Sequence, residues 1–216
     1  MCGFYACGLC NLQHLPRSAR RGYAPLGAFK PVSAAMSLIL SPSSLPGGAH
    51  ALSPAADAIT FMMLMNSSIR RFLVGEQIRG APYLEKFDVE ALPTGYLVCA
   101  PGGRVGEVGQ AELIQEGQTD EVYSYALTAR MFGFKILYLE AGSGAETQVH
   151  PRLIETARTV DNLTLLVGGG IRTPEQAVLA ANAGADWIVT GTLTEDAADL
   201  DELRSRISGI VSALRN

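Results

Sequence analysis

One glutamate and several glycines follow apolar segments of this sequence in an order that could bind a phosphate ester and activate its hydroxyl. The run Tyr138-Leu-Glu-Ala-Gly-Ser-Gly144 follows apolar residues directly, as do Gly168-Gly-Gly170 and Gly191-Thr192 further along the chain. Glycines let a phosphate approach backbone N–H groups, and a helix that begins nearby adds a favourable field. A partly desolvated carboxylate such as that of Glu140 can accept a hydroxyl proton while the oxygen attacks an electrophile.

Each of these features also has a purely structural explanation. Glycines at strand-to-helix turns are often structural, but two such turns after consecutive strands favour a phosphate site, with Ser143 and Gly144 closing its third side. Glu140 is either solvated at the end of its strand or oriented on a substrate hydroxyl. Tyr138 points the same way two residues earlier, which favours the second role. A structural role and a role in the same site are equally open for Asn66, Ser67 and Ser68.

Apolar segments alternate with helical ones from about residue 36 onward. Pro151 and Pro174 occupy the position of a first helical residue, and Gly133 and Gly184 follow the ends of helical patterns. The segment 106–119 lacks a clear period, which predicts a loop. Strands are predicted at residues 37–40, 58–65, 93–99, 135–140, 163–168 and 186–191, and helices at 69–78, 119–132, 151–160, 174–183 and 200–214.

The predicted strands consist of continuous Leu, Ile and Val rather than alternating polar and apolar residues. Such strands are typical of parallel sheets that are covered on both faces. Repeated βα units form either an open doubly wound sheet or a closed (β/α)8 barrel. Candidate functional residues at the ends of neighbouring strands, with phosphate loops after the last two, favour the barrel. The sequence therefore predicts an α/β fold of the TIM-barrel type, incomplete because six strands are recognisable.

The composition excludes several classes of protein. The chain has 216 residues, of which 48% are hydrophobic, and this fits a single globular domain with a substantial core. A net charge of −4 gives no reason to expect a nucleic-acid partner. No apolar stretch reaches the roughly 18 residues of a membrane-spanning helix. Four cysteines do not make a secreted disulfide framework, so a cytoplasmic location is expected.

The first 56 residues differ in composition from the rest of the chain. They contain no Asp or Glu, and all their charged side chains are basic. This predicts an atypical basic, acid-free leader at residues 1–35, followed by a barrel-type domain at residues 36–216. The cysteines near the start, together with His14, lack the two C-x-x-C pairs typical of zinc sites, so no metal ligands are assigned there.

Three motifs together resemble the geranylgeranylglyceryl phosphate synthase family: residues 138–144, residues 167–175 and residues 183–192. Residues 52–57 and 93–96 also resemble it, and the similarity extends over roughly residues 37–196. The resemblance implies a modified TIM barrel that joins sn-glycerol 1-phosphate to a polyprenyl diphosphate, giving an ether lipid precursor and pyrophosphate. It further implies an apolar groove for the prenyl chain, peripheral membrane contact through the lipid product, and a homo-oligomer.

The resemblance also implies roles for single residues. Glu140 would hold and deprotonate the glycerol hydroxyl that attacks the prenyl carbon. Glycerol phosphate would be bound by Tyr138, Leu139, Glu140, Ala141, Gly142, Ser143 and Gly144, and its phosphate by Gly169, Gly170, Gly191 and Thr192.

One departure from the family limits these implications. Family members begin with a strand that ends in an Asp-Pro-Asp-Lys-like motif, which helps to hold the Mg2+ that binds the diphosphate. Here no acid precedes Asp57, so the first two βα units are expected to be missing. Mg2+ is still expected as a cofactor from the resemblance, but no ligands are assigned to it. Because a diphosphate leaving group needs this metal, this chain alone is expected to have weak or no activity. The alternatives are a family remnant that only binds a phosphate ester and another phosphate-binding barrel enzyme, such as a sugar-phosphate isomerase.

Overall fold

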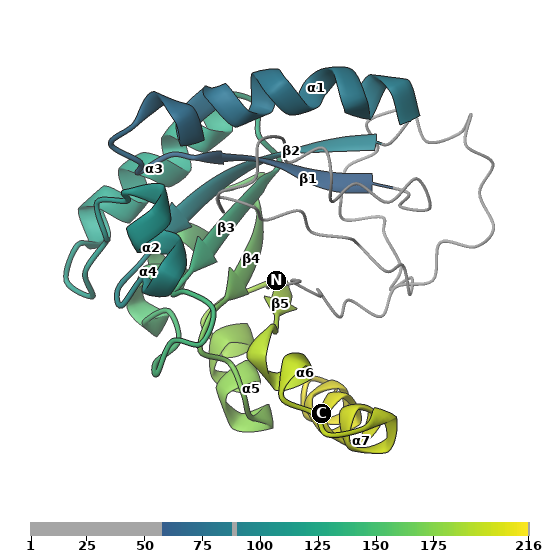
Figure 1. Ribbon diagram of the computed structural model, residues 1–216. Helices are drawn as coiled ribbons and strands as arrows, with labels where there is room; N and C mark the ends of the chain where they lie inside the picture. The colour runs from purple at the N-terminus through teal and green to yellow at the C-terminus, as the bar shows by residue number, and fades with distance from the viewer. Residues whose placement is uncertain (1–57, 88–89, 216) are drawn as a thin grey trace.

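Five parallel strands form one sheet in the computed structural model, which describes residues 58–87 and 90–215 (Figure 1). The strands are β1 (Ala58–Leu64), β2 (Glu90–Val98), β3 (Ile136–Glu140), β4 (Thr164–Gly168) and β5 (Trp187–Val189). They confirm five of the predicted strands, with ends that differ by up to a few residues. The strand predicted at 37–40 and the boundary predicted at residue 36 lie outside the described residues.

Helical segments connect and follow these strands. They are η4, a π-helical segment (Arg71–Gly75), α1 (Glu76–Phe87), α2 (Gly103–Gly109), α3 (Thr119–Met131), α4 (Pro151–Arg158), α5 (Pro174–Asn182), α6 (Thr192–Glu195) and α7 (Leu200–Ala213). The predicted proline starts of α4 and α5 are confirmed, and Gly133 has the positive φ of 83° expected after α3.

The prediction of a loop from residue 106 was wrong at its beginning, because α2 continues to Gly109. Glycine is a poor helix former, so local propensity argued against a helix here. Close packing of this segment against neighbouring side chains explains why it is nevertheless helical. A Cβ atom on Gly106 would lie 2.9 Å from the Leu113 side chain, and one on Gly109 would lie 2.5 Å from the Leu64 side chain. The glycines thus let this helix pack closely against its neighbours.

The order of the strands in the sheet distinguishes the two fold classes that the sequence allowed. Hydrogen-bonded neighbours follow the chain order β1-β2-β3-β4-β5, and every pair is parallel. A doubly wound sheet would contain a reversal of this order. Right-handed connections without a reversal place the helices on one side, and Figure 1 shows α1, α3, α4 and α5 around the outside of the strands. The described residues therefore form an arc of a barrel.

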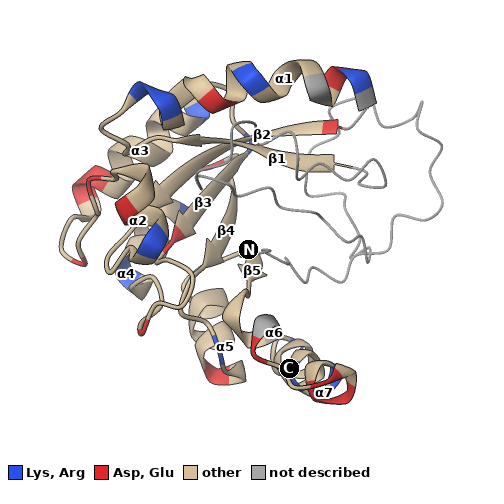
Figure 2. Ribbon diagram, viewed as in Figure 1, with Lys and Arg blue, Asp and Glu red and all other residues tan. Residues whose placement is uncertain are grey.

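Alternate residues of the strands face two different cores. On β3, Leu137 and Leu139 pack outward against residues of α3, α4 and α5, whereas Ile136 and Tyr138 face the inner cluster with Tyr96 and other strand residues. Charged residues lie mostly on helices and loops (Figure 2). Within the five strands only Glu90 and Glu140 are charged, and Glu140 alone of the two is buried. The fold thus places one carboxylate on the inner face, at the carboxyl end of its middle strand.

Candidate active site

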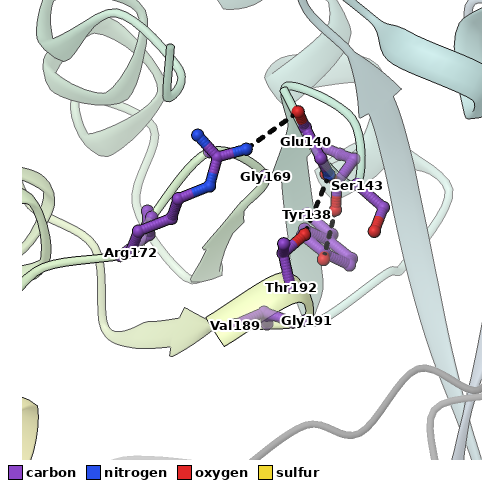
Figure 3. A pocket seen from close by; sticks show the side chains of 11 residues that line it. Tyr138, Glu140, Ser143, Gly169, Arg172, Val189, Gly191 and Thr192 are labelled. Carbon is purple, nitrogen blue, oxygen red and sulfur yellow. Dashed lines mark hydrogen bonds between the residues drawn. The ribbon is translucent and has the colours of Figure 1, made fainter. Parts of the chain in front are cut away.

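A pocket lies at the carboxyl ends of β3, β4 and β5 and encloses about 330 Å3 of space, part of it open to solvent (Figure 3). Side chains and backbone from the three loops that follow these strands form its wall. The lining residues are Tyr138, Glu140, Ser143, Gly144, Gly169, Gly170, Ile171, Arg172, Val189, Gly191 and Thr192.

The pocket brings together the predicted site residues from all three motifs. Only Leu139, Ala141 and Gly142 of the predicted set are not among the residues that line it. Leu139 and Ala141 are fully buried in the outer core, because side chains alternate along the strand. Gly142 does not line the pocket but helps to orient Glu140, because its N–H donates a hydrogen bond to that carboxylate.

Glu140 is held in one orientation by two hydrogen bonds. The carboxylate is only 2% exposed. Its Oε2 accepts a hydrogen bond from the Tyr138 hydroxyl at 2.5 Å, and its Oε1 accepts one from the Gly142 N–H at 2.7 Å. Each carboxylate oxygen has two lone pairs, so both oxygens can still accept a further hydrogen bond. Glu140 can therefore bind a hydroxyl group that enters the pocket.

The surroundings of Glu140 favour its use as a base. Burial raises the pKa of Glu140 above its ordinary value, although the hydrogen bonds from Tyr138 and Gly142 act in the opposite direction. Burial, and then the negative charge of Glu140, raise the pKa of Tyr138 well above its ordinary value. The Tyr138 hydroxyl therefore stays protonated and remains a donor. A carboxylate with a raised pKa is a stronger proton acceptor once it is ionised.

Two glycines allow the loop after β3 to lie close to the loops after β4 and β2. Gly169 has a φ of 80°, and a Cβ atom there would collide with the Glu140 carboxylate and lie 2.6 Å from the Gly142 nitrogen. Gly142 has a φ of 105°, and its Cβ atom would lie 2.5 Å from the carbonyl oxygen of Gly102. Both positions combine a left-handed backbone with close contact, so a larger residue would displace Glu140 or its loop.

Gly144 connects all three strand-end loops. Its N–H donates to Thr192 Oγ1 at 3.1 Å, and its carbonyl oxygen accepts a hydrogen bond from Arg172 Nη2 at 2.9 Å. Arg172 was missed in the sequence analysis as a site residue. Its signal was present, because it follows the Gly168-Gly-Gly170 turn by one apolar residue and directly precedes the helix start at Thr173.

The residues at the end of β1 have a structural role. The Asn66 amide donates hydrogen bonds to the carbonyl oxygens of Val98 and Glu112, both at 2.9 Å, and accepts one from the Val98 N–H at 3.1 Å. Ser67 Oγ donates to Gly109 O at 2.7 Å, and Ser68 Oγ donates to Gln110 O at 3.0 Å. None of the three lines the pocket. They tie the end of β1 to β2 and to the segment after it.

Replacing Asn66 by alanine is expected to lower the free energy of unfolding by about 2–4 kcal/mol, because buried backbone groups of Val98 lose their partners. Ser68→Ala removes one exposed hydrogen bond on the adjacent residue and is expected to cost less than about 0.5 kcal/mol. Urea unfolding monitored by circular dichroism measures both. Equal midpoints for the two variants would contradict the structural role of Asn66.

Neither a metal site nor a membrane-spanning helix is found among the described residues. Within residues 58–87 and 90–215, no group of three or more His, Cys, Asp and Glu side chains could hold a metal ion, so no described residue is assigned to Mg2+. In the same part of the chain, no helix is long and apolar enough to cross a membrane.

Comparison with known proteins gives a family match and several close relatives. A model of the PcrB family matches residues 31–210. The geranylgeranylglyceryl phosphate synthase of Thermoplasma volcanium is 43% identical over 169 residues, covering 78% of this chain and 67% of the relative. The enzyme of the same name from Cenarchaeum symbiosum is 47% identical over 166 residues, covering 77% and 67%. The chain thus spans about two thirds of the length of these relatives.

Solved structures agree with this result. The crystal structure of (S)-3-O-geranylgeranylglyceryl phosphate synthase from Thermoplasma acidophilum, in complex with substrate sn-glycerol-1-phosphate, has a TM-score of 0.72 and 41% identity, covering 78% of this chain and 67% of that one. The wild-type enzyme from Thermoplasma volcanium has a TM-score of 0.71 and 43% identity, covering 75% and 64%. These similarities confirm the resemblance stated from the motifs and the incomplete TIM-barrel-type fold.

Proposed function

Because the chain belongs to the PcrB family, we propose that it is a prenyltransferase that joins sn-glycerol 1-phosphate to a polyprenyl diphosphate, forming an ether lipid precursor and pyrophosphate. The observation that carries this proposal is the position of Glu140. Its carboxylate lies in a pocket that also contains the glycines of two strand-to-helix turns. One substrate with a hydroxyl group and a phosphate group would use both features.

In this proposal, the phosphate group of the substrate lies against the turns after β4 and β5. Among the described residues, the N–H groups of Gly169 and Gly170 donate to no protein acceptor. Gly191 and Thr192 form the adjacent wall, and Ser143 adds a hydroxyl group from the loop after β3. Backbone N–H groups without side chains in front of them can surround phosphate oxygens closely.

In the same proposal, the glycerol part of the substrate points toward Glu140. As a glycerol hydroxyl oxygen forms a bond to the diphosphate-bearing carbon of the prenyl chain, its proton passes to a Glu140 oxygen. The carbon–oxygen bond to the diphosphate breaks, and pyrophosphate leaves with the bonding electron pair. Tyr138 holds Oε2 throughout and keeps the carboxylate aimed at the substrate.

Further elements of the proposal come from the family rather than from the pocket. Mg2+ is proposed as a cofactor because a diphosphate leaving group needs charge neutralisation, but no described residue is assigned to it and no step depends on it here. We also propose a cytoplasmic location, peripheral membrane contact through the lipid product, and assembly into a homo-oligomer.

The test of this proposal is product formation by the full chain. Radiolabelled sn-glycerol 1-phosphate is incubated with geranylgeranyl diphosphate and Mg2+, and the ether product is extracted into organic solvent and counted. Labelled ether lipid that requires both substrates is the expected result, formed slowly because no described residue is assigned to the Mg2+ that would neutralise the diphosphate. Binding of glycerol phosphate by calorimetry without any product would instead support a protein that only binds the phosphate ester. Turnover of a sugar phosphate without a prenyl substrate would support a different barrel enzyme.

A further inference from the structure

Arg172 is the only cationic side chain among the described residues that line the pocket, and its partner there is uncharged. The guanidinium donates one hydrogen bond, from Nη2 to the carbonyl oxygen of Gly144. Figure 3 shows Arg172 extending from the loop after β4 across the pocket toward the loop after β3. A guanidinium carries five N–H donors in a planar fork, so most of its donor capacity is not used by Gly144.

Glu140 does not neutralise this charge. Its two oxygens accept from the Tyr138 hydroxyl and the Gly142 N–H, and among the described residues no ion pair joins it to Arg172. Arg172 is exposed at the rim, whereas Glu140 is buried at the base. The two charges therefore divide the pocket into a negative inner part and a positive outer part.

The start of α5 is less available to an anion than its position suggests. The Gln176 side chain accepts hydrogen bonds from the N–H groups of Arg172 and Thr173, and Thr173 Oγ1 accepts from the Gln176 N–H. This capping box occupies donors that a helix N-terminus would otherwise offer to a phosphate. Glu175 adds a negative charge in the first turn of the same helix. The favourable electrostatic field of this helix N-terminus, which the sequence suggested for a phosphate, thus acts mostly on the protein's own Gln176, Thr173 and Glu175 side chains.

We propose that Arg172 binds the phosphate group of the substrate directly, as the counter-charge that the backbone of the pocket does not supply. The inference rests on the proposed function, because it takes glycerol phosphate as the ligand. In this arrangement the N–H groups of Gly169 and Gly170 contact the phosphate from one side, and the Arg172 fork contacts it from the rim. A guanidinium and a phosphate form paired, charge-assisted hydrogen bonds, which are stronger than the bond to the neutral Gly144 carbonyl.

The experiment compares Arg172→Gln, Arg172→Lys and a matched control, Arg152→Gln, in the full chain. Arg152 is an exposed arginine on α4 that does not line the pocket. Isothermal titration calorimetry measures the Kd of sn-glycerol 1-phosphate and of inorganic phosphate at several salt concentrations. Arg172→Gln is expected to weaken both ligands by roughly 10- to 100-fold, Arg172→Lys by less, and Arg152→Gln by less than about twofold.

The salt dependence separates direct contact from a role in holding the Gly144 loop. Direct contact predicts that the Kd of the wild-type protein rises with salt and that this dependence is much smaller in Arg172→Gln. An equal Kd in Arg172→Gln and the wild type, or a weaker Kd with an unchanged salt dependence, would overturn the inference and leave the proposed function intact. Failure of the wild-type protein to bind glycerol phosphate would instead overturn the proposed function itself.

Discussion

Replacing Glu140 by glutamine is expected to reduce the rate of ether formation at least about 100-fold, because an amide cannot take up the hydroxyl proton. Glutamine has nearly the same shape, and it can still accept a hydrogen bond from Tyr138 or Gly142. Phosphate affinity is therefore expected to change by less than about twofold. The measurements are product formation from labelled glycerol phosphate and calorimetry with inorganic phosphate.

Glu146 provides the matched control for this variant. It lies on the same loop after β3, but its side chain is exposed and does not line the pocket. Glu146→Gln makes the same chemical change and is expected to leave the rate within about twofold of the wild type. If both variants were equally active, Glu140 would not be the base.

The pH dependence of the reaction gives a second readout of Glu140. A base acts when it is deprotonated, so the rate should rise as the pH increases through the pKa of this carboxyl group. Because burial raises that pKa above the ordinary value of 4.5, the rise should occur above pH 4.5. Tyr138→Phe removes a hydrogen bond that lowers the pKa of Glu140, so the rise should move to higher pH in that variant. A rise at the same pH in both proteins would contradict this coupling.

Replacing Gly169 by alanine is expected to weaken glycerol phosphate binding at least about tenfold and to lower the free energy of unfolding by roughly 2–4 kcal/mol. The added Cβ would collide with the Glu140 carboxylate and lie 2.7 Å from the Ala141 nitrogen, and the backbone φ of 80° disfavours any side chain. The carboxylate and the loop after β3 would both have to move. Calorimetry and urea unfolding measure the two effects.

A substitution at Gly133 separates the free-energy cost of a side chain on a left-handed backbone from the cost of close atomic contact. Its φ of 83° is nearly the same as that of Gly169, but no atom lies within 4 Å of the position that a Cβ would occupy. Gly133→Ala is therefore expected to cost only about 1–2 kcal/mol and to leave ligand binding unchanged. Equal effects of the two substitutions on binding would show that close contact at Gly169 has no role in the site.

The sequence by itself determined the five strands of the described residues, the starts of α3, α4 and α5, and the three loops of the site, but it did not predict α2. A mainly apolar run such as Leu163-Thr-Leu-Leu-Val167 favours a strand buried on both faces, and Pro174 after Thr173 favours a helix start through local geometry alone. These are short-range effects, so they can be read from neighbouring residues. The glycines after two consecutive strands and Glu140 were identified for the same reason.

Only the tertiary structure decided how these parts act on each other. Strand order excluded a doubly wound sheet, and alternation along β3 separated Glu140 from Leu139 and Ala141. Asn66 became a structural residue because its partners lie 32 and 46 positions away in the chain. Arg172 was recognised as a pocket residue only in the structure, because its hydrogen-bond partner Gly144 belongs to a different loop. Burial, charge balance and long-range hydrogen bonds depend on which segments meet in space, and this depends on packing of the whole domain.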